Sequence, residues 1–233
     1  MNRKYFFMVM LAVGLLLCQT APFATAGPED DKIESSLSVL KDITDIPETG
    51  IPPALLGDAH GIVIVPDVVK LGFIVGGKYG SGILMVHKED GTWSNPTFVN
   101  LYGGSFGWQI GAQATDLILV IKSRRGIDGI KNGKFTIGAD ASVAAGPVGR
   151  SASAATDVLL KAEILSYSRS RGVFAGLSLE GAALQIDHKA NETFYRKPDV
   201  RVDDIFYGES MSPSGTIWKI KKLLTDYTSP SEN

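Results

Sequence analysis

The chain has 233 residues, of which 23 are lysine or arginine and 25 are aspartate or glutamate, giving a formal net charge of −2. This length is sufficient to bury a hydrophobic core without help from disulfide bonds. The near-neutral charge excludes nucleic-acid binding driven by overall basicity, so attraction to any anionic partner must come from a local patch.

The N-terminal residues predict a secretory signal peptide over residues 1–26. Arg3 and Lys4 precede an apolar run from Tyr5 to Leu17, which is too short to span a bilayer comfortably. Ala24, Thr25 and Ala26 then supply the small residues that signal peptidase recognises. We therefore expect cleavage before residue 27 and a location in the bacterial periplasm or outside the cell.

The single cysteine, Cys18, lies inside this predicted signal peptide. A lipoprotein signal would place a small residue before the cysteine, whereas Leu17 occupies that position. Lipid attachment through Cys18 is therefore the less favoured alternative. Without Cys18 the mature chain contains no disulfide of its own and no thiolate metal ligand. No repeat or linker divides residues 27–233, so we expect one domain.

The first element of the mature chain is predicted to be a helix. Ile33, Leu37, Leu40 and Ile43 recur at helical spacing, and prolines at 47, 52 and 53 follow them. A single apolar stripe indicates that this helix packs against the rest of the domain.

From Gly61 to Asp187 the pattern changes to strands. They are predicted at 61–66, 71–77, 82–87, 105–112, 115–121, 162–168 and 173–186. The first should stop at Pro66, and the glycines of segment 76–82 should form a tight turn. Segment 115–121 is apolar on both faces, as in a central strand. The chain has 26 glycines, many within these strands, which favours a bent or closed antiparallel sheet.

Three further helices are predicted in the second half of the chain. Two short ones, at 124–130 and 191–196, lie between strands, and a longer one covers 214–227. In the last, Ile217, Ile220 and Leu224 share one face. The predicted fold class is α+β: a glycine-rich, bent antiparallel sheet or barrel with flanking N- and C-terminal helices.

The central part of the chain resembles the SYLF domain, a lipid-binding family found in bacteria and eukaryotes. Several long segments match in the family's order, which is far more specific than one short motif, and together they cover about 51–207. These segments are AHGIVIVP (59–66), GGKYGSG (76–82), GWQIGAQATD (107–116), FTIGADASVAAGPVGR (135–150), LSYSRSRGVFAG (165–176) and LEGA (179–182).

The resemblance implies affinity for phospholipid. Eukaryotic members of the family carry added modules and are associated with phosphoinositides and actin filaments. No lipid-contact residue of the family is matched in this sequence, so the position of a site has to be argued from physical chemistry.

Two basic clusters are the candidate lipid-binding residues. One follows the predicted strand 115–121, and the other lies on the C-terminal helix, where a tryptophan accompanies the lysines. Tryptophan and lysine together suit the headgroup region of a membrane. A merely solvated basic face is the alternative for both clusters. The first cluster is Lys122, Arg124, Arg125, Lys131 and Lys134, and the second is Trp218, Lys219, Lys221 and Lys222.

Asp116, Asp140 and Arg150 lie in runs of small or apolar residues and are predicted to be partly buried. A buried charge needs a partner, which favours a structural ion pair or hydrogen-bond network. A polar ligand pocket is the alternative. His60, His87 and His188 lie in unrelated sequence contexts, so no metal site is predicted.

Two glycine-rich motifs suggest catalysis or phosphate binding only weakly. Gly103–Gly107 fits the Gly-x-Ser-x-Gly pattern around Ser105, but such an elbow needs a helix directly after the serine, and strand-like residues follow instead. Segment 76–82 would need a following helix to bind phosphate, and a strand is predicted there.

The sequence therefore favours a non-catalytic, cofactor-free protein that binds anionic phospholipid at a membrane surface in the bacterial envelope. The alternative is a protein-interaction module that docks a filament, an envelope protein or a host protein. A serine hydrolase is the third hypothesis.

Overall fold

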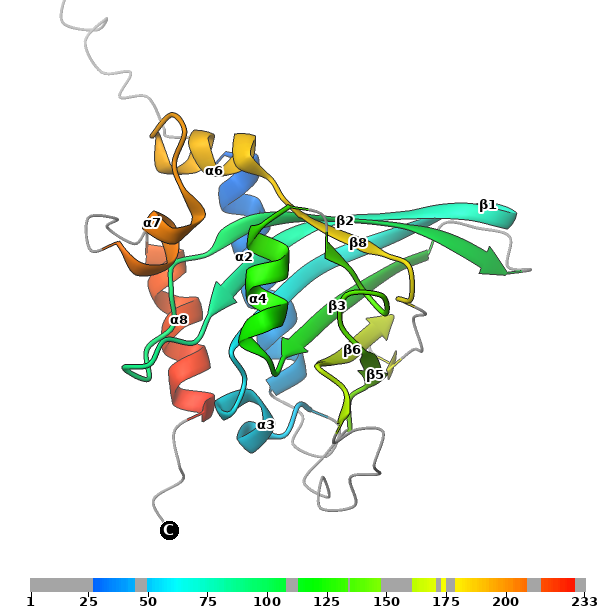
Figure 1. The fold of residues 1–233 in the computed structure, drawn as a ribbon, viewed down its shortest axis with the longest axis horizontal. Helices are drawn as coiled ribbons and strands as arrows, with labels where there is room; N and C mark the ends of the chain where they lie inside the picture. The colour runs from blue at the N-terminus through cyan, green and yellow to red at the C-terminus, as the bar shows by residue number, and fades with distance from the viewer. Residues whose placement is uncertain are drawn as a thin grey trace, which may run out of the picture.

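The computed structural model describes residues 27–44, 50–107, 113–133, 135–147, 161–170, 173–174, 179–208 and 215–228, with the backbone alone at 71–75, 105–107, 113 and 173–174. A curled sheet lies between helices (Figure 1). The helices are α2 (Pro28–Thr44), α3 (Pro53–Gly57), α4 (Arg124–Lys131), α6 (His188–Tyr195), α7 (Val202–Tyr207) and α8 (Gly215–Thr228). The strands are β1 (Gly61–Val86), β2 (Thr97–Gly107), β3 (Gln113–Ile121), β4 (Phe135–Thr136), β5 (Val143–Ala145), β6 (Ile164–Ser170), β7 (Val173–Phe174) and β8 (Ala183–Ile186).

The long strand β1 folds back on itself. Its 26 residues would extend over about 85 Å if they were straight. Instead, its first half pairs with β3 from Gly61↔Ile121 onward, and its second half pairs with β2 as far as Leu84↔Thr97. The two halves lie side by side, because the backbone N–H just after the strand, at position 87, donates to the carbonyl at position 60 over 3.0 Å. The segment 76–82, expected to form a turn, is therefore part of a strand.

Pro66 does not end the strand, contrary to the sequence-based expectation. The register with β3 shifts between Val65 and Val68, and Asp67 has a φ of 48°. The N–H of Asp67 leaves the ladder and donates to Oδ1 of Asp116 over 3.1 Å. A bulge at this point accommodates the missing proline N–H, so the strand continues beyond it.

The eight strands form one bent sheet in the order β4-β8-β2-β1-β3-β6-β5, with β7 paired to β6. Every pairing between the named strands is antiparallel except that of β5 with β6, so the predominantly antiparallel sheet is mixed at this edge. Because β1 contributes two adjacent strands, β3 returns to lie beside the first of three consecutive strands, which is a Greek-key arrangement. The prediction of a bent sheet with flanking helices is confirmed.

Alternate residues of the sheet face two hydrophobic clusters. Ile64 and Ile118 belong to the cluster that α2 and α8 cover, whereas Val63 and Leu117 belong to the cluster that α4 and α7 cover. Strand β3 is buried on both faces, as predicted for 115–121. No helix in the described part of the chain is long and apolar enough to span a membrane.

The predicted helices are confirmed with shifted ends. In α2, the four stripe residues Ile33, Leu37, Leu40 and Ile43 are all buried, and in α8 the predicted face packs onto the sheet. Helix α4 begins after Ser123, whose Oγ accepts a hydrogen bond from the N–H of Gly126 over 3.1 Å. Two short helices, α3 and α7, were not predicted. In Figure 1, α7 and α8 lie at the left of the view, and α4 lies in front of the sheet to their right.

Candidate functional site

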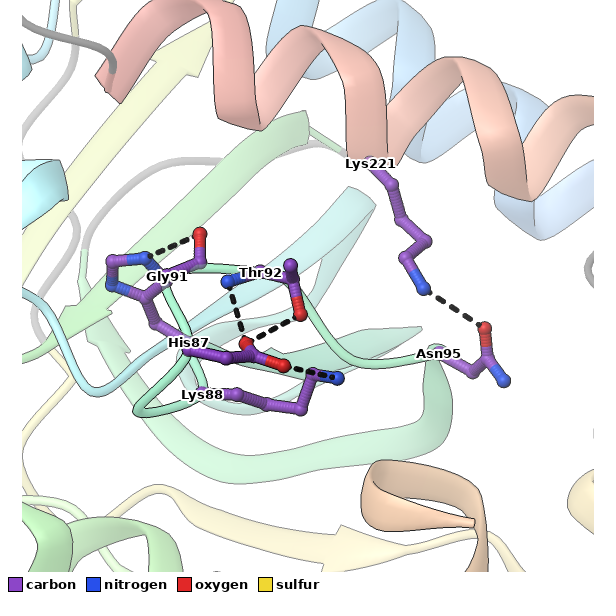
Figure 2. A network of polar contacts seen from close by, with 7 residues as sticks. His87, Lys88, Gly91, Thr92, Asn95 and Lys221 are labelled. Atoms are coloured by element: carbon purple, nitrogen blue, oxygen red, sulfur yellow. Dashed lines mark hydrogen bonds and ion pairs between the residues drawn. The ribbon is translucent and has the colours of Figure 1, made fainter. Parts of the chain in front are cut away.

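The connection between β1 and β2, residues 87–96, is a turn with ring stacking and hydrogen bonds of its own. The ring of Trp93 stacks on that of His87 with centroids 4.7 Å apart and an interplanar angle of 14°. Oδ1 of Asp90 accepts hydrogen bonds from both N–H and Oγ1 of Thr92, at 2.8 and 2.6 Å. These bonds, with the nearby Lys88 ammonium, lower the pKa of Asp90 to about 2. Figure 2 shows these polar contacts within the turn.

A cleft of about 580 Å³ opens between this turn, α4 and the end of α7. Its wall is apolar where Val86 and Ile127 contribute and polar elsewhere, and Tyr207 is an exposed aromatic ring at its side. The lining residues are His60, Val86, His87, Lys88, Glu89, Asp90, Arg124, Ile127, Asp128 and Tyr207. A concave surface with a few convergent polar groups is the usual setting for a binding site.

Two of the three histidines meet in this cleft, although their sequence contexts are unrelated. His60 and His87 are brought together by the pairing of the two halves of β1. The ring nitrogens of His87 lie 3.3 Å from the carbonyl oxygens of Ala59 and Gly91, whereas Nδ1 of His60 is buried without a hydrogen-bond partner among the described residues. His188 lies elsewhere, at the start of α6. No group of three potential metal ligands occurs in the described residues.

Two of the five cations of the first basic cluster, Arg124 and Lys131, form ion pairs with acids. Arg124 pairs with Glu89 of the turn over 2.7 Å, at a site where both side chains are exposed, by 66% and 83%. Lys131 pairs with Asp203 of α7 and lies 3.9 Å from Asp128. The remaining members are Lys122, which is half-buried, Arg125, which is exposed, and Lys134, which lies outside the described residues.

In the second basic cluster, Lys221 contacts the turn, whereas Trp218, Lys219 and Lys222 are exposed to solvent. Lys221 donates to Oδ1 of Asn95 over 3.4 Å, and burial together with the nearby Lys88 lowers the pKa of Lys221 (Figure 2). Lys222 pairs with Asp226 at 2.8 Å. Trp218 is 58% exposed, and Lys219 is exposed beside it. The turn thus lies between the two clusters, with Arg124 on one side and α8 on the other.

The predicted polar core is not one site. Asp116 is half-buried on β3, where burial raises its pKa, and it lies opposite Arg169, which pairs with Asp42 of α2 at 3.3 Å. Asp140 is exposed, not buried, and its Oδ2 accepts from the N–H of Thr136 over 2.6 Å in the turn after β4. Arg150 lies outside the described residues. Both aspartates therefore have local structural roles.

The glycine-rich motifs do not have the surroundings that their chemistry requires. Ser105 is paired with Gly76 within the ladder between β1 and β2, and β2 continues through Gly107. A nucleophile elbow needs a turn into a helix directly after its serine. Asp187 and His188 are an acid and an imidazole that a serine hydrolase would need, but Asp187 caps α6 by accepting a hydrogen bond from the N–H of Ala190 over 3.0 Å. Segment 76–82 lies inside β1, which continues to Val86, so a strand and not a helix comes directly after it.

Residues 102–227 match the sequence model of a family described as "Ysc84: Las17-binding protein actin regulator". The chain is 34% identical over 195 residues to SH3 domain-containing YSC84-like protein 1 of Xenopus laevis, covering 80% of this chain and 58% of that protein. It is 32% identical over 206 residues to the protein of the same name in Homo sapiens, covering 86% and 59%, and 38% identical over 148 residues to Protein YSC84 of Saccharomyces cerevisiae, covering 62% and 31%. The chain therefore spans less than two thirds of the curated relatives it matches.

Proposed function

Because the chain belongs to the Ysc84 family, which is the SYLF family of the sequence resemblance, we propose that it is a non-catalytic protein-interaction module that docks its partner in the cleft beside the turn. The single observation that carries this proposal is the mixed-charge lining of the cleft. It combines Arg124 and Lys88 with Glu89, Asp90 and an exposed tyrosine. Tyrosine and arginine are enriched at protein interfaces, where they dominate the binding energy.

The ion pair between Arg124 and Glu89 is suited to exchange with a partner. Both side chains are largely exposed, and such a surface pair contributes at most about 1 kcal/mol of stability. A carboxylate of the partner can replace Glu89 at the Arg124 guanidinium without disrupting the fold. The ring of Tyr207 stands at the side of the same cleft and offers an apolar surface for packing.

The family description directs the choice of partners to test. We expect residues 27–233 to bind purified actin filaments or Las17, with Arg124→Glu and Tyr207→Ala each weakening binding by about tenfold or more. Arg124→Glu places a second negative charge next to Glu89, and Tyr207→Ala removes an aromatic contact. Co-sedimentation measures binding to filaments, and fluorescence anisotropy measures binding to Las17.

Lys219→Glu is the matched control for the charge change, because Lys219 is exposed on α8 and does not line the cleft. This variant should bind like the parent chain. Binding to neither partner, or binding that both cleft variants leave intact, would refute docking of these proteins at the cleft.

Phospholipid binding is the second candidate function, and the exposure of Trp218 beside Lys219 favours it. The ion pair of Lys222 with Asp226 and the contact of Lys221 with Asn95 reduce the charge available to a membrane. If α8 contacts lipid, anionic vesicles should shift the tryptophan emission to the blue, and salt should weaken binding. The shift should vanish in Trp218→Phe.

Charge reversals distinguish the two basic clusters in the same vesicle assay. Reversal of Lys219, Lys221 and Lys222 to glutamate should abolish binding through α8, whereas reversal of Lys122, Arg124 and Arg125 should abolish binding through the other cluster. The electrostatic lipid model would be ruled out if both triple variants co-sediment with vesicles as the parent chain does and the emission of Trp218 does not shift.

We also propose that the protein acts outside the cytoplasm after removal of residues 1–26. The support is the sequence alone: the apolar run from Tyr5 to Leu17 and the small residues Ala24 to Ala26. Mass spectrometry of the protein recovered from its own cells tests this by identifying the N-terminal residue, which should be Gly27. A diacylated Cys18 at the N-terminus would contradict it.

A further inference from the structure

The outer edge of β2 continues beyond its neighbouring strand. Strand β8 pairs with β2 from Val99↔Ile186 to Tyr102↔Ala183, whereas β1 stays paired on the other side as far as Ile74↔Gly107. Figure 1 shows β1 and β2 running on, at the right of the view, past the end of β8. Among the described residues, no strand pairs with the outer edge of β2 from Gly103 to Gly107.

The backbone groups on this edge can be assigned by alternation along β2. The N–H of Phe98 donates to Oδ1 of Asn191 and its carbonyl accepts from the N–H of Asp187, each over 2.9 Å, so both groups face away from β1. The register with β1 is regular from Thr97 to Gly107. Every second residue therefore faces the same way, and the N–H and C=O of Gly104 point outward.

The residues that precede β8 turn away from these groups. Continued pairing of β8 would have placed Gly181 opposite Gly104, but Gly181 has a φ of +74°, and its N–H donates to the carbonyl of Ile137 over 2.9 Å. Within the described residues the donor and acceptor of Gly104 therefore have no strand partner. Such groups are a template for an added strand.

An ordered aromatic pair lies beside this edge. Tyr79 and Tyr102 are cross-strand neighbours with ring centroids 5.3 Å apart, and their side chains are 48% and 41% exposed. The hydroxyl of Tyr79 donates to Oδ1 of Asn100 over 3.3 Å, and Nδ2 of Asn100 donates to Oδ2 of Asp187 over 3.0 Å. The pair is thus held in place on a sheet face that α2 and α8 do not cover at this point.

Two glycines create open space next to the tyrosines on the same face. Gly77 and Gly104 are register partners, one pair further along the ladder than Tyr79 and Tyr102. Among the described residues, a Cβ at Gly104 would meet nothing within 4 Å, and one at Gly77 would meet only the carbonyl of Gly103, at 3.9 Å. An aromatic side chain on a neighbouring strand covers an edge glycine favourably.

We propose that an extended segment of a partner polypeptide adds to β2 as a new antiparallel edge strand opposite Gly103–Gly107, with an aromatic side chain over Gly104 and Gly77. The outward N–H and C=O of Gly104 can form hydrogen bonds with an extended backbone. The space over the glycine pair beside Tyr102 can hold a large aromatic ring. This is recognition by strand addition, in which backbone hydrogen bonds give affinity and side-chain contacts give specificity. This surface shares no residue with the cleft, so a negative result at one site leaves the proposal for the other site untouched.

The probe is a short synthetic peptide of alternating threonine and valine with one central tryptophan, capped at both ends and added to residues 27–233. Its binding is followed by the backbone amide signal of Gly104 in NMR and by calorimetry. With the tryptophan opposite Gly104, N-methylation of the tryptophan amide should weaken binding about tenfold or more, because this N–H faces β2. N-methylation of the preceding amide, which faces away, should have little effect. Equal effects of the two methyl groups, or no binding, would overturn the proposal.

Two variants of the protein, in place of changes in the peptide, test the same edge. Gly104→Pro removes an N–H that does not belong to the β1 ladder, so the fold should persist while binding falls about tenfold or more. If Gly104→Pro does not fold, Tyr102→Ala should still lose most of the affinity. Unchanged binding in the folded variants would refute the site. A concentration-dependent dimer without peptide, abolished by Gly104→Pro, would assign the edge to a second copy instead.

Discussion

Replacement of Trp93 by alanine should destabilise the protein by about 3–5 kcal/mol. Trp93 is fully buried, and its ring stacks on His87 at the base of the turn between β1 and β2. The substitution removes a large apolar volume and leaves a cavity that the ordered turn cannot fill. Guanidinium unfolding of residues 27–233, followed by far-ultraviolet circular dichroism, measures the loss.

Trp218→Ala provides a matched control of the same chemical change. Because Trp218 is 58% exposed on α8, its removal should alter the free energy of unfolding by no more than about 0.5 kcal/mol. Equal losses in the two variants would mean that the turn is not packed as described. Loss of the turn should also abolish docking in the cleft, since His87, Lys88 and Glu89 line it.

Gly82→Ala should also be strongly destabilising, with an expected loss of about 3 kcal/mol. A Cβ at this position would lie 2.0 Å from the carbonyl oxygen of Ile64 and 2.7 Å from Cα of Val65. Both are backbone atoms of the other half of β1, so no side-chain rotation relieves the clash and the two halves must separate. The same unfolding experiment measures the effect.

Gly104→Ala is the control for this change in the same sheet. Its Cβ would meet nothing within 4 Å in the part of the chain that the structure describes, and alanine restricts the unfolded chain. The stability of this variant should therefore stay within about 1 kcal/mol of the parent. Should Gly82→Ala prove as stable as Gly104→Ala, the close approach of the two β1 halves would be wrong.

Hydrophobic periodicity made the helices and the central strand predictable. The stripe from Ile33 to Ile43 and the face shared by Ile217, Ile220 and Leu224 are buried as expected, because one apolar face per helix can be satisfied only by packing. The doubly apolar strand 115–121 is buried on both faces for the same reason. The abundance of glycine correctly indicated curvature.

Local chain chemistry misled the prediction of β1. Pro66 reads as a strand end, but a bulge at Asp67 removes the problem of its missing N–H, and the partner that stabilises this bulge, Asp116, is distant in the sequence. The glycines of segment 76–82 read as a turn, whereas Gly80 and Gly82 are needed for close approach to Val65 and its neighbours. A strand partner, not the local sequence, decided both cases.

The basic clusters were found from the sequence, but their charge balance was not. Lys222 and Asp226 are four residues apart on one helix, so their ion pair can be predicted from the sequence. Arg124 and Glu89, or Lys131 and Asp203, become neighbours only through the fold. His60 and His87 are likewise distant in the sequence and lie close together only because the hairpin in β1 brings its two ends side by side.

The packing of α2 against α8 joins the first and last helices described in the chain. Leu40 of α2 and Ile220 and Leu224 of α8 belong to one buried cluster with the sheet. A chain that is still being synthesised therefore lacks the helix that completes this cluster until α8 has emerged. Until then, the apolar stripe of α2 and the sheet face beneath it stay open to solvent, so nascent chains are the stage at which chaperones have most to bind and aggregation is most easily initiated.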